Sequence, residues 1–359
     1  MLTYWLMFLL PASAALFART RRANALTGER DYRLDGMWWS IVVVLTALIG
    51  FRLEVGGDWF NYFKYLFKVR DISLGDTLLL DDPGYHLITW LSVRAGWGVF
   101  GLNLMGGAVF AIGLAVFCRS LPRPWLALAV AVPYMVIVVG MGYARQAIAL
   151  GFAMLGLVAL GRKSTAWFVV WVVLGATMHK SAVLLLPIAA LASSRNRWWS
   201  MAWVGVVALG AYVLFLQESV DALYTNYVEA QYQSQGALIR LVMNALPAAI
   251  LLGWQRRFDF SAGEAPLWRW FAIISLVLLG VLLLTPASTA VDRVALYMLP
   301  LQLVVFSHFP DVFGRRGKRN DLQVAAVVGY YAAVQFVWLN FASHSQYWLP
   351  YRFYPLELL

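Results

Sequence analysis

The sequence predicts an all-α polytopic membrane protein, with about ten transmembrane helices and additional re-entrant or interfacial helices in a single integral membrane domain, residues 1–359. Hydrophobic residues make up 62% of the chain and charged residues only 13%, which excludes an ordinary soluble domain. Apolar segments of about 17 to 22 residues recur from end to end, the length that a helix needs to cross roughly 30 Å of hydrocarbon. The period-two alternation of membrane β-strands is absent, so the spans are helices.

The expected transmembrane helices follow from these apolar segments, and aromatic residues near their ends support the boundaries. Pairs such as Trp38/Trp39 and Trp198/Trp199 stand where amphipathic rings anchor a helix at the membrane surface. The first segment lacks a basic amino-terminal region and a good cleavage site, so we expect a span there and not a signal peptide. The expected spans are 2–18, 37–53, 100–118, 124–141, 143–161, 198–216, 237–255, 267–285, 293–310 and 322–341.

Basic clusters set the orientation of the spans, because they fall in every second turn between them. Under the positive-inside rule these turns stay in the cytoplasm, which places the amino terminus outside, with loops at about 54–82 and 217–236 and the tail at 342–359. The net charge of +10 then reflects anchoring beside anionic membrane lipids and not binding of nucleic acid. The basic turns contain Arg19, Arg21, Arg22, Arg30, Arg33, Arg119, Arg123, Arg162, Lys163, Arg195, Arg197, Arg256, Arg257, Arg269, Arg315, Arg316, Lys318 and Arg319.

Two segments do not fit this alternation as full crossings. The segment 83–98 is short and interrupted by polar residues and glycines, so we expect an interfacial or re-entrant helix. The basic pairs at 162–163 and 195–197 are both expected inside, although too few residues separate them for two ordinary spans. A helix, a break at 177–180 and a returning helix satisfy both pairs, since broken helices are tolerated inside protein or beside a wet cavity. The alternative is one long span, with one arginine pair breaking the rule.

Single polar residues in the outer turns are the candidates for chemistry. Asp58 follows Gly56 and Gly57, whose backbone freedom allows a sharp turn where the chain leaves the membrane. A carboxylate held there can act as a general base or bind a hydroxyl-rich substrate; the alternative is a cap on the following helix. Asp82 stands before a Pro-Gly turn into a helix, so capping is the preferred interpretation there.

Arg145 and the pair His179-Lys180 lie within otherwise apolar stretches. Arg145 begins an apolar helix with no acid within a turn of it, and an unpaired arginine at this depth marks a ligand or a buried partner, unless it snorkels to lipid headgroups. Its planar guanidinium matches a phosphate with two hydrogen bonds. His179 is a candidate proton relay and Lys180 a candidate phosphate ligand; the alternative is a structurally satisfied histidine.

Cations on the outer side would suit a lipid diphosphate without a metal. The four histidines lack metal-ligand spacing and Cys118 is the only cysteine, so we expect no metal, no cofactor and no disulfide. For Arg293, one of the cations named next, the alternative is a salt bridge with Asp292 at the start of a helix. The cations are Arg52, Arg145, Lys180, Arg240 and Arg293, with Arg352 as a weaker sixth.

The ordered motifs are Arg52…Gly57-Asp58…Tyr62, Asp82-Pro-Gly-Tyr85, Tyr143-Ala-Arg145-Gln and His179-Lys-Ser-Ala. Their order and spacing resemble the EpsG family of bacterial polysaccharide membrane proteins, which are Wzy-like polymerases. The resemblance covers residues 37 to 300, and the ordered set carries it, since each motif alone is weak. Family members more often have a Thr before the first aspartate and a Glu before Pro-Gly-Tyr, where this chain has Gly57 and Asp82; Asp58 and Tyr85 stay aligned.

The resemblance implies a GT-C-like helical fold and a glycosyltransferase at the outer face of the bacterial cytoplasmic (inner) membrane. Its implied reaction joins oligosaccharide repeat units carried on undecaprenyl diphosphate. The implied partners are these lipid-linked oligosaccharides and membrane lipids, with a chain-length regulator protein as a candidate. Tyr62 and Tyr85 are expected among the substrate-binding residues.

The charge argument assigns the catalytic roles within this reaction. Arg145, Arg293 and Arg240, with Lys180, are expected to stabilise charge on the departing diphosphate. Either His179 or Asp58 is expected to accept the proton of the attacking hydroxyl.

Other functions fit the same charges. A single-sugar glycosyltransferase would use a polyprenyl phosphate donor and add one unit where a polymerase makes a ladder of products. A transporter or flippase for lipid-linked glycan would predict matching halves with broken helices in equivalent places, and the second half has no twin of the break near His179. A structural subunit of a polysaccharide assembly is the third alternative.

Overall fold

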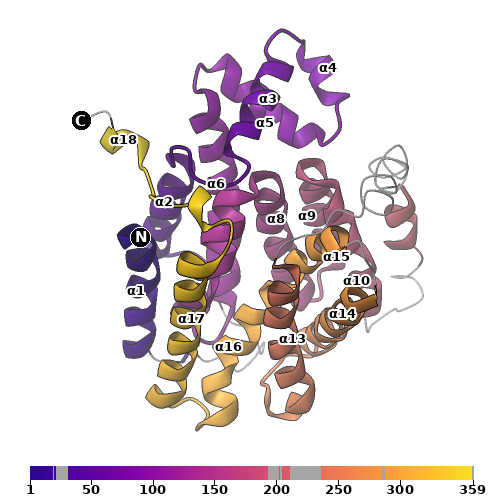
Figure 1. Cartoon of the computed structure of the whole chain (residues 1–359). Coiled ribbons are helices and arrows are strands. Elements are labelled where there is room, and N and C mark those ends of the chain that lie inside the picture. Colours follow the sequence, from indigo (N-terminus) through magenta and orange to yellow (C-terminus); the bar gives the residue numbers. More distant parts are fainter. Residues whose placement is uncertain are drawn as a thin grey trace.

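The computed structural model describes residues 1–18, 20–21, 31–192, 202, 204–210, 236–284 and 288–357. Most of the expected span at 198–216 and nearly all of the expected loop at 217–236 lie outside these residues. Within them the chain forms a bundle of helices (Figure 1) and no β-strand. The predicted all-α fold is therefore confirmed.

Five described helices are long and apolar enough to cross a membrane, and five shorter apolar helices of 10–17 residues accompany them. The long ones are α6 (Gly98–Ser120), α8 (Ala144–Gly161), α14 (Glu264–Leu284), α17 (Asp321–Phe341) and the segment Val291–Phe313, which joins the end of α15 (Ser288–Ala295), η6 (Leu296–Met298) and α16 (Pro300–Phe313). The shorter ones are α1 (Leu2–Phe17), α2 (Gly36–Gly50), α7 (Pro124–Ala131) with η1 (Val132–Gly140), α9 (Thr165–Met178) and α13 (Ala237–Gly253). These apolar helices fit a membrane protein, while the count of ten spans stays a prediction.

Glycines allow α6, α8 and α9 to pack closely within the bundle. A Cβ on Gly113 of α6 would lie 2.2 Å from the carbonyl oxygen of Gly151 on α8, and a Cβ on Gly175 of α9 would lie 3.2 Å from the α8 backbone. Small residues permit such close contact, and van der Waals packing of this kind holds membrane helices together where lipid tails remove the hydrophobic driving force. The packing fixes the ends of α8 and α9 that carry Arg145 and His179.

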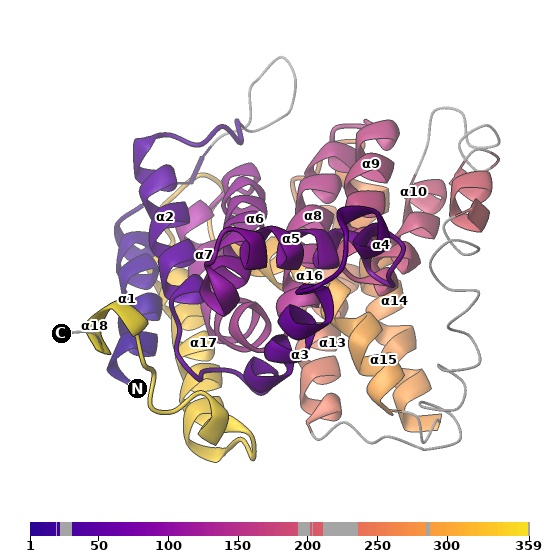
Figure 2. The same cartoon turned by 90° about the horizontal axis from the view of Figure 1, so that it is seen from above.

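Three short helices cover one end of the bundle, which we call the capped end: α3 (Trp59–Val69), α4 (Leu74–Leu78) and α5 (Pro83–Arg94) (Figures 1 and 2). Helix α5 has 12 residues, about 18 Å of helix, and is too short to cross a membrane. This agrees with the interfacial helix predicted at 83–98. The start of α1 meets the C-terminal tail at the same end, where the Tyr4 hydroxyl donates to the carbonyl oxygen of Trp348 at 2.8 Å.

The chain breaks at His179, between α9 and the two short helices η2 (Lys180–Leu185) and α10 (Leu186–Ala192). His179 has an extended backbone (φ −155°, ψ 111°), through which an α-helix cannot continue. Helix α10 then packs against both α9 and α14. The predicted break at 177–180 is confirmed, while the return of the chain to the side of 162–163 stays a prediction, because residues 193–200 lie outside the described residues.

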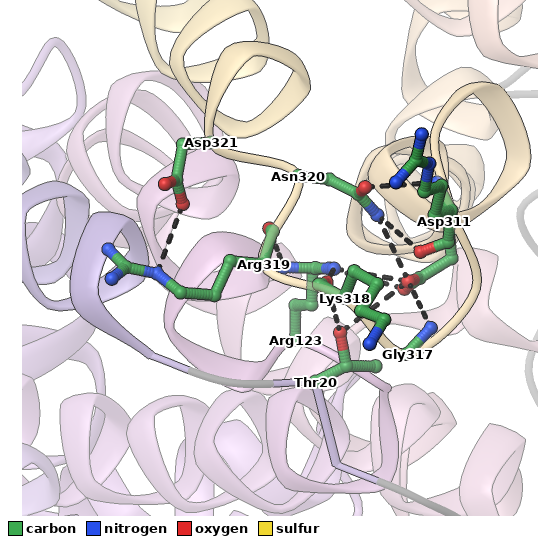
Figure 3. A network of polar contacts seen from close by, with 9 residues as sticks. Thr20, Arg123, Asp311, Gly317, Lys318, Arg319, Asn320 and Asp321 are labelled. Atoms are coloured by element: carbon green, nitrogen blue, oxygen red, sulfur yellow. Dashed lines mark hydrogen bonds and ion pairs between the residues drawn. The ribbon is translucent and has the colours of Figure 1, made fainter.

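The opposite end of the bundle, which we call the basic end, is organised by a buried ion pair (Figure 3). Arg123, between α6 and α7, donates from Nη2 to Oδ1 of Asp311 on α16 at 3.1 Å and from Nε to Oδ2 at 3.2 Å. The same guanidinium donates to the carbonyl oxygens of Lys318 and Arg319, so it fixes the basic turn between α16 and α17. The sequence identifies Arg123 only as a signal of orientation; its partner 188 residues away gives it a structural role.

We expect Arg123→Ala to destabilise the protein by roughly 3–5 kcal/mol, because it leaves the largely buried Asp311 without its partner. Thermal unfolding in detergent would show this as a lower midpoint. Arg319→Ala is the matched control, since Arg319 pairs with Asp321 at the surface, where an ion pair contributes about 0–1 kcal/mol. Equal shifts for the two variants would contradict the structural role of Arg123.

Candidate active site

A sharp turn brings Asp58 to the capped end, at the start of α3. Gly56 has φ +103°, and a Cβ there would lie 2.2 Å from a backbone carbonyl oxygen of the η1–α8 turn, so this position requires glycine. Tyr62, one turn into α3, accepts a hydrogen bond from the backbone N–H of Ala144 at 3.1 Å. This bond fastens α3 to the start of α8, beside Arg145.

The Asp58 carboxylate is half-buried and does not cap α3, so the capping alternative is wrong. It accepts a long hydrogen bond from the Asn61 amide at 3.4 Å, and both Arg293 and Arg145 act on it electrostatically. Burial raises the pKa of Asp58 above its usual value, and the Asn61 hydrogen bond and the two arginines offset part of that rise. A carboxylate of raised proton affinity therefore lies among cations.

Asp82 joins three elements of the site. Its Oδ2 accepts from Nη1 of Arg145 at 2.9 Å, and its Oδ1 accepts from the backbone N–H of Lys180 at 3.1 Å. These bonds connect the start of α5 with α8 and with the break after α9. Asp82 has a left-handed backbone (φ 53°, ψ 59°) and makes no capping hydrogen bond, so the predicted cap is wrong. Arg145 is ion-paired and not an isolated cation. Its partner, Asp82, lies 63 residues away in the chain, so the residues near Arg145 in the sequence do not reveal it.

Arg145 remains partly accessible although it is ion-paired. Its side chain is 31% exposed, and its Cζ lies 4.9 Å from the ring centre of Tyr65 and 5.9 Å from that of Tyr85. Aromatic faces stabilise a cation at such distances, and the two rings, whose centres are 5.4 Å apart, both contribute to the position of the guanidinium. Tyr85, like Tyr62, is itself buried and forms part of the packing behind the site.

His179 belongs to a small polar chain at the break. Its Nδ1 accepts the backbone N–H of Ser181 at 3.3 Å and lies 2.9 Å from the Ser181 hydroxyl, which lies 3.1 Å from the hydroxyl of Tyr297. Because Nδ1 accepts, the neutral ring carries its proton on Nε2. Arg145 acts on this histidine electrostatically, together with Lys180.

Arg293 reaches the same cluster from α15. The side-chain amide of Gln146, the residue after Arg145 on α8, donates to the carbonyl oxygen of Arg293 at 2.7 Å. Arg293 acts electrostatically on both Asp58 and His179. Two arginines from α8 and α15 thus share one neighbourhood with a carboxylate and a histidine.

The other predicted cations have different surroundings. Nε and Nη2 of Arg240 donate to the two carboxylate oxygens of Asp292, a pair that ties α13 to α15. Arg52 is fully buried and donates to backbone carbonyl oxygens of its own turn and to the side-chain oxygen of Asn103. Arg352 pairs with acids of its own tail and of the turn after α2. These partners give all three arginines a role in holding the fold.

Four residues that help to build the site are not predicted to do so from the sequence. They are Asp82, which is predicted only as a helix cap, Gln146, Ser181 and Tyr297. Gln146 has a readable signal, because a buried amide directly after an arginine is unusual in so apolar a helix. Tyr297 has none, since a tyrosine near the end of an apolar segment is typical of membrane helices.

Arg145 and Lys180 are joined through Asp82, and Arg145 and Arg293 both act electrostatically on Asp58 and His179 at the capped end. Guanidinium and ammonium groups are those that bind phosphate, and carboxylate and imidazole groups are those that accept a proton. The sequence model of the EpsG family matches residues 37–353, which include this entire cluster. The chain belongs to the EpsG family. EpsG proteins are related to the Wzy-like polysaccharide polymerases, so this EpsG protein has a place in polysaccharide biosynthesis at a membrane. No curated protein matches the chain.

Proposed function

We propose that this EpsG protein is a metal-independent GT-C-type glycosyltransferase, a Wzy-like polymerase that joins oligosaccharide repeat units carried on undecaprenyl diphosphate. The observation that carries the proposal is the set of bonds that joins Arg145 and Lys180 through Asp82, and α8 to Arg293 through Gln146, at the end of the bundle where both arginines act electrostatically on Asp58. Transfer from a lipid diphosphate needs a proton acceptor for the attacking hydroxyl and positive charge for the departing group. The GT-C-like fold with ten spans belongs to the same proposal, supported by the five long and five shorter apolar helices.

In the proposed reaction, the growing glycan on undecaprenyl diphosphate is the donor and a fresh lipid-linked repeat unit is the acceptor. The acceptor hydroxyl oxygen attacks the anomeric carbon of the donor sugar, and the bond from that carbon to the diphosphate oxygen breaks. The hydroxyl proton passes to Asp58. Undecaprenyl diphosphate leaves while Arg145 and Arg293, with Lys180, stabilise its charge.

We assign the proton acceptor to Asp58 in preference to His179. The Nδ1 atom of His179 is occupied by the N–H of Ser181, so the neutral ring presents Nε2–H, a donor. His179 then serves by donating a hydrogen bond to a substrate oxygen. Arg52 and Arg240 are left out of the diphosphate site because they are buried or nearly so, whereas Arg145 keeps 31% of its side chain exposed beside its partner. Arg352 is left out because it pairs with two acids, Glu54 and Glu357.

The test of the reaction is the length of its product. Purified protein in lipid vesicles, supplied only with lipid-linked repeat units, is expected to give a ladder of glycans by gel electrophoresis. One added unit, formed only from a polyprenyl phosphate sugar, would identify the single-sugar transferase instead. Movement of the lipid-linked glycan across the bilayer without a new glycosidic bond would indicate a flippase and contradict the proposal.

We propose further that the capped end faces the outside of the bacterial cytoplasmic membrane, because the basic turns gather at the opposite end. Single cysteines replacing Asn61 and Lys318, exposed residues of the two ends, test this orientation. An impermeant maleimide added to intact cells should label the cysteine at Asn61 and spare the one at Lys318 until the cells are broken. The reverse pattern would overturn the orientation. Cys118 is buried and gives little background.

A further inference from the structure

Helix α3 has an exposed aromatic face although it lies outside the spanning helices. Phe60, Phe63 and Phe67, which we call the phenylalanine face, have 67%, 38% and 67% of their surfaces exposed. Their spacing of three and four residues places them on one stripe of the helix. The residues buried on its other side are Trp59, Tyr62 and Val69.

Lysines and leucines border the phenylalanine face. Lys64 and Lys68 are exposed on the adjoining stripe of α3, one helical turn apart. The following helix, α4, and the residue after it also expose apolar side chains, those of Leu74, Leu78 and Leu79. A helix with bulky apolar side chains on one stripe and lysines beside them has the composition of helices that lie in the plane of a membrane surface.

Contacts with two spanning helices set the depth of α3. The Tyr62 hydroxyl accepts the N–H of Ala144, the first residue of α8, and the ring of Trp59 lies 5.9 Å from that of Phe100, near the start of α6. Both α6 and α8 are long enough to cross a membrane, so their ends mark its surface. Figure 1 shows α3, α4 and α5 gathered at that end of the bundle. Helix α3 is therefore fastened at the level where the hydrocarbon ends.

We propose that the phenylalanine face and the exposed leucines of α4 insert between the headgroups and the acyl chains of the leaflet at the capped end. Lys64 then meets anionic headgroups, to which its charge is complementary, while Lys68 beside it pairs with Asp81 at 3.4 Å. Insertion removes from water the three exposed phenylalanine rings of α3.

Insertion of α3 into the lipid surface has a meaning for glycan transfer only if the proposed function holds, and it rests on that function. Asp58 directly precedes α3, so the helix that lies in the lipid surface also carries the proton acceptor. A lipid-linked acceptor then meets Asp58 at the depth where its own headgroup lies, without leaving the bilayer.

Nitroxide labels test the proposal in a Cys118→Ser background, on single cysteines that replace Phe60, Lys64, Phe67 or Lys68. The protein is placed in nanodiscs of phosphatidylethanolamine and phosphatidylglycerol, and power-saturation EPR compares access to oxygen with access to a water-soluble nickel complex. At Phe60 and Phe67 oxygen access is expected to exceed nickel access, as it does in lipid. At Lys64 and Lys68, the matched controls on the same helix, the order is expected to reverse.

Two outcomes would overturn the proposal. High access of the nickel complex at all four positions would place the phenylalanine face in water. Low access of both reagents at Phe60 and Phe67 would indicate that protein, such as a second copy of the chain, covers the face. The measurement needs no glycan transfer, so its failure and the failure of the proposed reaction are distinguished by assaying the same nanodiscs with lipid-linked repeat units.

Discussion

Arg145→Ala should eliminate long glycan chains while the protein still reaches the membrane. The guanidinium is partly exposed, lies beside two tyrosine rings and acts electrostatically on Asp58, so its loss removes charge where the diphosphate is expected to leave. Removing one preorganised donor of this kind costs roughly 10²- to 10³-fold in rate. Glycan length on gels and initial rates in vesicles measure the effect.

Arg145→Ala also leaves the Asp82 carboxylate buried without its partner, so a structural cause must be separated from a chemical one. The double variant Asp82→Asn/Arg145→Ala removes that buried charge and should regain thermal stability without regaining activity. Arg94→Ala is the matched control, because Arg94 is an exposed arginine of α5 that stacks on Trp90. Wild-type chain lengths in Arg145→Ala, or recovery of activity in the double variant, would refute the role of Arg145 in charge stabilisation.

Asp58→Asn should lower the rate of transfer by roughly 10²- to 10⁴-fold, the contribution of a general base, and leave binding of the lipid-linked substrate nearly unchanged. Asparagine has almost the shape of aspartate but cannot accept the proton. Single-turnover rates and binding to the immobilised protein separate the two effects. Asp71→Asn is the control, because Asp71 is an exposed acid between α3 and α4 at the same capped end. A wild-type rate in Asp58→Asn would transfer the role of base to another group.

The pH dependence of the rate gives a second test of Asp58. A general base works only when deprotonated, so activity should be present above the pKa of Asp58 and be lost as the pH falls through it. Because burial raises this pKa, the loss should occur at a higher pH than the value of about 3.9 for an ordinary aspartate. Initial rates over a pH series measure the midpoint. The same acidic limb in Asp58→Asn, at its lower rate, would show that another group titrates.

The sequence predicts the features that depend on local composition. Runs of apolar residues define most of the described helices, and the basic turns at 119–123 and 315–319 meet at one end of the bundle as their charge indicates. The break at His179 is also predictable, because two basic pairs that must share one side of a membrane leave too little chain for two ordinary crossings. The lengths of the apolar runs and the positions of the basic residues are enough to predict these helices, the end where the basic turns lie, and the break.

The partners of the buried charges are not predictable in this way, since they depend on which distant segments pack together. Arg145 finds Asp82 across 63 residues and Arg240 finds Asp292 across 52. Read singly, these arginines look like unpaired cations and the aspartate at 82 looks like a helix cap. Their true environment follows from the close packing of α6, α8 and α9 and from the docking of α5 on the break, where a Cβ on Gly84 would lie 2.3 Å from the Thr177 hydroxyl.

A cryo-EM map of the protein with bound undecaprenyl diphosphate would locate the headgroup directly. We predict that the diphosphate lies at the capped end, with its oxygens within about 3 Å of the guanidinium groups of Arg145 and Arg293. The Asp58 carboxylate should face the side from which an acceptor hydroxyl approaches. A headgroup bound at the basic end, or one at the capped end that contacts neither arginine, would contradict a transfer site built from these residues.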